Sequence, residues 1–204
     1  MACAFARARV NVLTTALALA LWAGAGIWSP RVALAQAAPE VGGPFELIDQ
    51  HGRPFSSAAL AGHPYAIFFG FTNCPDICPT TLLEMSSHLG KLGSDGDRLK
   101  VVFVTVDPER DAPEQLRAYL SSFDPRIIGL TGSPEQVAAT AKAWKAFHDK
   151  IPEDGGGYTI VHSAYVYLMD ADNRCVGTMG FQDAEADQLE KLRGLLAGGR
   201  GKSK

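Results

Sequence analysis

Two long apolar runs constrain the fold of this 204-residue chain more than any other feature. They are YAIFFGF, at residues 65–71, and LKVVFVTV, at residues 99–106. A strand with one buried face alternates apolar and polar residues, whereas a strand buried on both faces is apolar throughout. The runs therefore predict two central strands of a sheet that is covered by helices on both sides.

The rest of the chain supplies the other strands and the helices. Ser133, Pro134 and Gln136 have the pattern of a capping box at the start of a helix. Short strands flank a turn at His51–Gly52, and a later hairpin turns at Asp172–Asn173. Strands with crossover helices, followed by an antiparallel hairpin and a last helix, predict an α/β protein with a thioredoxin-like fold, a central mixed sheet with flanking helices. Helices are expected at 80–92, 112–123, 133–147 and 183–197, a further short strand at 126–130, and a long glycine-rich loop at 150–163.

The first residues have the composition of a targeting segment. A basic start precedes an apolar stretch from Val10 to Trp28, and ALAQ at residues 33–36 offers the small residues of a signal-peptidase site. Residues 1–35 are therefore expected to be a signal peptide or, since the stretch is long enough to span a bilayer, an uncleaved membrane anchor. Either outcome places the remainder in the periplasm, soluble or anchored to the inner membrane. The remainder is predicted to be one domain, residues 36–198, with a flexible tail at 199–204.

Charge and cysteine content argue against two classes of protein. The chain has 19 basic and 22 acidic residues and no basic patch, so we expect no nucleic-acid partner. Removal of a signal would leave Cys74, Cys78 and Cys175. Such a small, odd number, in a chain long enough to bury a core, argues against a disulfide scaffold.

The segment FFGFTNCPDICPTTL, residues 68–82, carries the candidate chemistry. Cys74 and Cys78 follow the first apolar run, at the strand end where open α/β sheets place their sites. On a regular helix, residues four apart have Cβ atoms about 5–6 Å apart, which suits two ligands of one ion better than a disulfide, with Cβ atoms roughly 3.8 Å apart. Pro79 is expected to start the helix, with residues 75–77 as a turn that can open and close. A metal site, a redox couple and an inert buried pair all remain open.

His162 is the candidate for a third ligand. It ends the expected loop and opens the strand SAYVYLM, and in a thioredoxin-like fold this position faces the cysteine loop. Thioredoxins place a cis-proline there to bind a partner's extended chain, whereas this chain has His162 and Ser163. A hydrogen-bonded structural histidine is the alternative. We expect His51, His63, His88 and His148 to occupy ordinary surface or boundary positions. Of these four, His88 and His148 are expected on helices.

Two thiolates and one imidazole favour copper over zinc. Soft sulfur ligands select Cu(I), whereas structural zinc takes four ligands. Asp107, after the second apolar run, should lie at the same sheet edge, where it either orients the site or only opens the turn before Pro108. Met85 is a candidate for an extra soft ligand, but its helical spacing with Leu82 and Leu89 favours a core position. Cys175 is expected to be a small buried residue.

Together these segments resemble the Sco/SenC family, the thioredoxin-like copper proteins of cytochrome c oxidase assembly. FFGFTNCPDICPTTL is similar to the family's metal-binding loop, VTVDPERD to its next strand end and YTIVHSAYVYLMD to its histidine strand. The resemblance implies that Cys74, Cys78 and His162 bind copper, as Cu(I) and also as Cu(II), and that the client is the binuclear copper site of oxidase subunit II. The family usually has an acidic residue directly before the histidine. This chain has Val161, so a carboxylate that would orient the imidazole is missing.

Three functions are compatible with these residues. A periplasmic copper metallochaperone needs the reduced cysteine pair and His162, and it would work with oxidase subunit II, a thioredoxin-like reductant and another copper carrier. A periplasmic thiol–disulfide reductase or redox sensor, roles to which related proteins have been assigned, needs only Cys74 and Cys78. A thiol peroxidase needs arginine or polar support beside one activated cysteine, of which TNCP gives little sign. Membrane contact is expected only through an uncleaved N-terminus.

Overall fold

The structure is a computed structural model that describes residues 41–198. The predicted signal or anchor and the predicted tail lie outside the described residues. Within residues 41–198, no helix combines the length and the apolar composition that crossing a bilayer requires.

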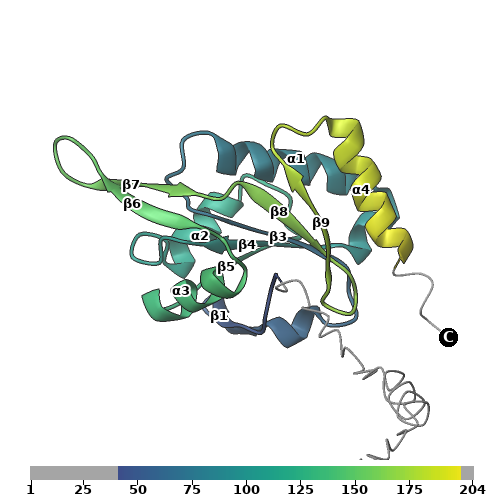
Figure 1. The fold of residues 1–204 in the computed structure, drawn as a ribbon, viewed down its shortest axis with the longest axis horizontal. Coiled ribbons are helices and arrows are strands. Elements are labelled where there is room, and N and C mark those ends of the chain that lie inside the picture. Colours follow the sequence, from purple (N-terminus) through teal and green to yellow (C-terminus); the bar gives the residue numbers. More distant parts are fainter. Residues whose placement is uncertain (1–40, 199–204) are drawn as a thin grey trace, which may run out of the picture. The chain divides into compact units, whose positions relative to one another are not determined.

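A mixed sheet of seven strands forms the centre of the described part (Figure 1). β3, β4 and β5 are parallel neighbours, and β8 and β1 flank this group as antiparallel partners. β9 and β2 complete the two edges as the second strands of hairpins. This confirms the predicted fold. Across the sheet the order is β2 (Pro54–Ser56), β1 (Glu46–Asp49), β5 (Ile127–Thr131), β4 (Lys100–Thr105), β3 (Tyr65–Gly70), β8 (Tyr165–Met169) and β9 (Cys175–Gly180).

The apolar runs are central strands, and their side chains divide between two cores. In β3, Tyr65, Ile67 and Phe69 belong to one core, whereas Ala66 and Phe68 belong to the other. Successive side chains of a strand point to opposite faces. Since both faces of β3 are covered, all six of its residues are buried.

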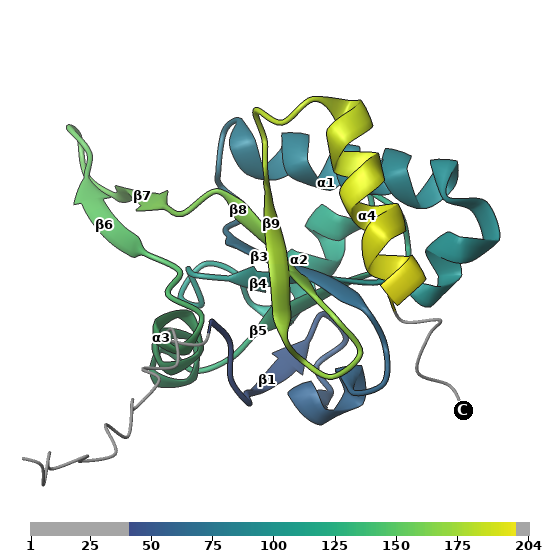
Figure 2. The same cartoon turned by 45° about the vertical axis from the view of Figure 1, so that its right-hand side comes forward.

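Helices cover both faces of the sheet (Figures 1 and 2). α3 packs on one face, whose core includes Trp144, and α1, α2 and α4 supply leucines to the core on the other face. α3 begins with the predicted capping box, in which Ser133 and Gln136 each accept the other's backbone N–H. The helices are α1 (Ile77–Lys91), α2 (Pro113–Leu120), α3 (Pro134–Ala143) and α4 (Glu185–Gly198), with short 3-10 helices η1 (Ser57–Leu60) and η2 (Gly93–Arg98).

The predicted glycine-rich loop is wrong, because residues 150–163 contain most of a third hairpin. β6 (His148–Pro152) and β7 (Tyr158–His162) form a separate two-stranded sheet, turned by Gly155–Gly157, which all have positive φ. The hairpin extends away from the main sheet (Figures 1 and 2). The sequence HDKIP conceals β6 because the strand is largely exposed and lacks apolar alternation. His148 consequently lies on a strand and not on the predicted helix.

Candidate metal centre

The two cysteines lie where β3 passes into α1. The helix begins at Ile77, two residues before the predicted start at Pro79, so Cys78 lies in its first turn. The proline is tolerated there because N–H groups of a first helical turn have no intrahelical partner. Cys78 is 1% exposed, whereas Cys74, in the preceding loop, is half-buried. The pair therefore has one sulfur in the core and one near the surface.

Gly70, the last residue of β3, leaves room for the buried sulfur. A Cβ at this position would lie 2.5 Å from the Cys78 Sγ and 2.8 Å from a ring carbon of Phe103. Any other residue would push the thiol away from the strand. The sequence signal is the glycine within the apolar run itself, because a glycine inside a strand often marks a close approach.

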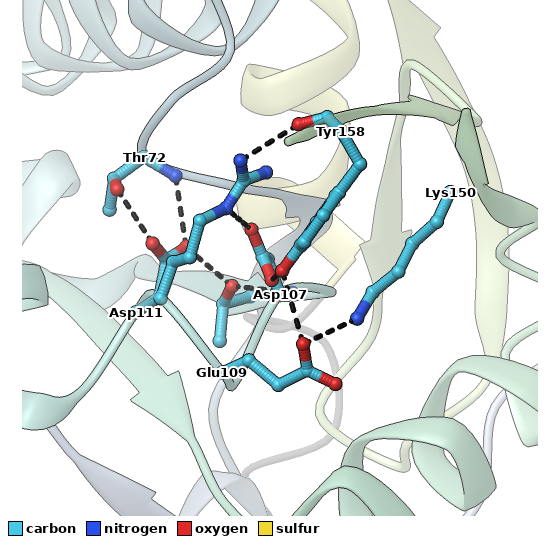
Figure 3. A network of polar contacts seen from close by, with 8 residues as sticks. Thr72, Asp107, Glu109, Asp111, Lys150 and Tyr158 are labelled. Carbon is cyan, nitrogen blue, oxygen red and sulfur yellow. Dashed lines mark hydrogen bonds and ion pairs between the residues drawn. The ribbon is translucent and has the colours of Figure 1, made fainter. Parts of the chain in front are cut away.

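A buried carboxylate holds the start of the cysteine loop. Asp111 has no exposed surface and accepts hydrogen bonds from the Thr72 backbone N–H (2.9 Å), the Thr72 hydroxyl (2.6 Å) and the Thr105 hydroxyl (2.6 Å) (Figure 3). Thr72 is two residues before Cys74. Asp111 therefore fixes where the loop leaves β3, a role that nothing in the segment DPERD assigns to its second aspartate from sequence alone.

His162 completes a group of three donors. It is the last residue of β7, and its Nε2 lies 3.4 Å from the Cys78 Sγ and 4.0 Å from the Cys74 Sγ. The three ligand atoms all lie within 4.8 Å of one another, and no other group of three or more His, Cys, Asp or Glu side chains in residues 41–198 could hold a metal ion. The structure thus brings together the three residues that the sequence predicts as ligands.

Two neighbours orient the imidazole of His162. Its Nδ1 lies 3.0 Å from the carbonyl oxygen of Ser163, which can only accept a hydrogen bond. Nδ1 therefore donates this hydrogen bond, and Nε2 is the ring nitrogen that faces the two sulfurs. The ring of Phe71 meets the imidazole edge to face, with 5.7 Å between centroids and 86° between planes.

The two thiols differ in acidity because they share a hydrogen bond. The bond from Cys78, aided by His162 and by backbone N–H groups of Cys78 and Asp76, lowers the pKa of the Cys74 thiol to about 3. The same bond, together with burial, raises the pKa of the Cys78 thiol well above its usual value. At neutral pH the reduced pair therefore shares one proton and carries one negative charge, on Cys74.

Alkylation of the reduced protein tests this charge state. An ordinary cysteine has a pKa of about 8.5 and should react on the order of 100-fold more slowly at pH 6 than at pH 8. Because the pKa of Cys74 is lowered, its thiolate persists at pH 6, and its rate should change less than about threefold over this interval. Iodoacetamide labelling with peptide mass spectrometry measures the rate, and urea-unfolded protein is the control. A parallel fall in folded and unfolded protein would refute the lowered pKa.

Comparison with known proteins places the chain. The SCO1/SenC family model matches residues 34–197. The chain belongs to the SCO1/SenC family. A SCO2-like protein of Rickettsia prowazekii is 43% identical over 155 residues, which cover 75% of each chain. The structure of Bradyrhizobium japonicum ScoI with copper bound has a TM-score of 0.71 and 41% identity, covering 76% of this chain and 99% of that chain.

A more distant SCO1/SenC structure connects the family to redox change. BsSco is described as a member of the Sco family of cytochrome c oxidase assembly proteins in which a disulfide switch was identified. Its TM-score is 0.62 at 25% identity, covering 77% of this chain and 94% of that chain. The family-model match and the 43% identical relative confirm the resemblance inferred from the cysteine and histidine segments.

Val161, the residue directly before His162, points away from the three donors. It is 53% exposed and pairs across the hairpin with Asp149. Neighbouring residues of a strand point to opposite faces, so Val161 and His162 do not share a face. The Ser163 carbonyl orients the imidazole, and that orientation does not require a carboxylate at residue 161.

Asp107 lies beside the site without touching its donors. It has no exposed surface, and in the described part of the chain its carboxylate binds the Arg110 guanidinium and the Tyr158 hydroxyl (2.7 Å), not Cys74, Cys78 or His162 (Figure 3). Its carboxylate is therefore connected to the metal centre only indirectly, through Arg110 and Tyr158. Its orienting role remains a prediction.

The other residues named from the sequence have structural positions. Met85 is 1% exposed in a core, as predicted, and Cys175 is half-buried on β9. The surface or boundary position predicted for His88 is wrong. This side chain has no exposed surface, and its Nε2 lies 2.6 Å from the Gln188 Oε1, which links α1 to α4. His51 and His63 are exposed, as predicted.

Proposed function

We propose that the protein is a periplasmic copper metallochaperone that binds copper through Cys74, Cys78 and His162. The observation that carries the proposal is the convergence of two sulfurs and one imidazole nitrogen within 4.8 Å. Sulfur donors select Cu(I), and Cu(II) is the second state proposed for the same site. A three-ligand site also leaves an open side for handing on the ion, whereas structural zinc takes four ligands. The copper-bound ScoI relative supports this assignment.

The proposed recipient is the copper site of cytochrome c oxidase subunit II. Support comes from BsSco, whose description places it among cytochrome c oxidase assembly proteins. The half-buried Cys74 would be the first sulfur that an incoming recipient ligand meets, since Cys78 is enclosed. Loading requires reduced sulfurs, because the thiolate is the ligand. A thioredoxin-like reductant and another copper carrier are therefore the proposed upstream partners.

Anaerobic Cu(I) titration of the reduced protein, wild type against His162→Ala, tests the proposal. The wild type should bind one Cu(I). Loss of an outer partner of a ligand already costs 10–100-fold in metal affinity, so loss of the ligand itself should cost at least about that, roughly 1.4–2.7 kcal/mol. His148→Ala is the matched control, because His148 pairs with His162 across the hairpin. Retention of Cu(I) by His162→Ala at the wild-type level against a competing chelator would reject His162 as a ligand.

The hydrogen-bonded cysteine pair favours a second candidate, a thiol–disulfide reductase or redox sensor. Cys74 carries the negative charge of the pair and is partly exposed. An attacking thiolate needs both this charge and this access. This function does not need His162. Reduction of a model disulfide should therefore survive in His162→Ala. A wild type that reduces the model disulfide but binds no Cu(I) would favour this candidate.

A further inference from the structure

The hairpin that carries His162 has few attachments to the main sheet. β6 and β7 pair with each other and with no other strand of the described residues. Ile160 is the buried residue of the hairpin, at 5% exposure, and β6 is half-buried or exposed along its whole length. A ribbon of two strands is only marginally stable by itself. The position of His162 therefore depends on contacts that tie the hairpin to the rest of the protein.

Arg110 makes two of these contacts, both with Tyr158. Its guanidinium donates to the buried carboxylate of Asp107 and, through Nη1, to the backbone carbonyl oxygen of Tyr158 at 2.8 Å. It also stacks on the Tyr158 ring, with the Cζ 3.9 Å from the ring centroid. One planar group thus binds the segment after β4 and the first residue of β7 at the same time. Arginine can do this because its donors form a rigid fork and its face stacks on aromatic rings.

Neighbouring groups reinforce the same junction (Figure 3). The Tyr158 hydroxyl donates to Asp107 at 2.7 Å. Lys150, from β6, forms an ion pair with Glu109 at 2.7 Å and lies 4.4 Å from the centroid of the Tyr158 ring. The Lys150–Glu109 pair is exposed and contributes little to stability. The half-buried Arg110 and the buried Asp107 therefore make the main polar contacts to the hairpin, both at Tyr158.

Two short routes lead from Arg110 to the metal centre. Along β7, Tyr158 and His162 are four residues apart, so their side chains lie on the same face of the strand. Through the core, the Arg110 Cζ is 6.0 Å from the centroid of the Phe71 ring, against which the His162 imidazole packs. Both routes end at the imidazole.

We propose that Arg110 is a positioning residue that holds the β6–β7 hairpin so that His162 stays within reach of the two sulfurs. The proposal rests on the proposed function, because it assigns His162 as a ligand of the copper cargo. Arg110 itself does not bind the metal. Without its guanidinium the hairpin loses the hydrogen bond at the Tyr158 carbonyl and the stacking partner of the Tyr158 ring, and the imidazole separates from Phe71 and from the sulfurs.

NMR of the reduced, metal-free protein tests the positioning directly. The nuclear Overhauser effects between the rings of Phe71 and His162 should be present in the wild type and lost in Arg110→Met. Arg110→Lys is a second variant that retains a positive charge beside the buried Asp107, so it should fold even if Arg110→Met does not. It should also weaken the nuclear Overhauser effects between Phe71 and His162. The matched control is Arg174→Met, since Arg174 forms a comparable ion pair with Asp170 in the β8–β9 hairpin. Wild-type ring contacts in a folded Arg110→Met protein would overturn the proposal, whatever the protein's affinity for copper.

A double-mutant cycle separates positioning from general stabilisation. Arg110→Met should lower the affinity for Cu(I) about tenfold, the lower end of what outer partners of metal ligands contribute. In a protein that already carries His162→Ala, the same change should have no further effect, because Arg110 acts through the imidazole. Equal losses in the two backgrounds would show that Arg110 has a merely structural role. If the wild type binds no Cu(I), the proposed function fails, and the ring contacts still decide the role of Arg110.

Discussion

Cys74→Ser should lower the affinity for Cu(I) by at least about 100-fold. A serine hydroxyl stays protonated at neutral pH and is a hard donor, so the substitution removes the charged sulfur of the pair. The hydrogen bond between the two cysteines also changes, because the hydroxyl cannot supply the thiolate that accepts it in the wild type. Cys78 and His162 would then remain as two donors without the anionic one.

Competition with a Cu(I) chelator under anaerobic conditions measures this loss. Cys74 is half-buried in a loop, so the substitution should leave the melting temperature nearly unchanged. Cys175→Ser is the matched control, because Cys175 is likewise half-buried but lies on β9, where its thiol is 3.6 Å from the Gly177 carbonyl oxygen. Cys175→Ser should bind Cu(I) like the wild type. Equal affinity of Cys74→Ser and the wild type would remove the sulfur pair from the proposed site.

Strands with a continuous apolar sequence are predictable from the sequence, whereas the exposed β6–β7 hairpin is not. The runs that become β3 and β4 are covered on both faces, so burial fixes both their composition and their conformation. β6 is held by cross-strand backbone bonds and by the turn at Gly155–Gly157. Backbone pairing leaves little trace in side-chain composition. A sequence pattern therefore predicts the buried strands but not the hairpin that carries His162.

The same distinction applies to the site. Cys74, Cys78 and His162 are identifiable because few other residue types bind soft metals. Gly70 and Asp111 contribute a close approach and a hydrogen-bonded anchor, and such roles depend on which atoms the fold brings together. Asp107 illustrates the limit, since its place at the sheet edge follows from the end of β4, whereas its bonds to Arg110 and Tyr158 do not.

Asp111→Ala should destabilise the protein more than any other polar substitution near the site. The carboxylate has no exposed surface and accepts three hydrogen bonds from Thr72 and Thr105. Hydrogen bonds to a charged group contribute about 1.5–3 kcal/mol each, and loss of the buried charge offsets part of this, so we expect a cost of about 3–5 kcal/mol. For a domain of this size, each kcal/mol lowers the melting temperature by roughly 2–4 °C. A fall of roughly 6–20 °C is therefore expected.

The same substitution should also weaken copper binding, because Thr72 anchors the loop that carries Cys74. Asp111→Asn keeps one acceptor oxygen and should fall between alanine and the wild type in both melting temperature and Cu(I) affinity. Asp49→Ala is the matched control, since Asp49 is a buried carboxylate that accepts backbone N–H bonds from His51 and Arg53 in the β1–β2 turn. That variant should lose stability and keep its affinity for Cu(I). If Asp111→Ala and Asp49→Ala lost stability alike and neither lost affinity, Asp111 would be an ordinary turn anchor, and the geometry of Cys74 would have to be set within its own loop.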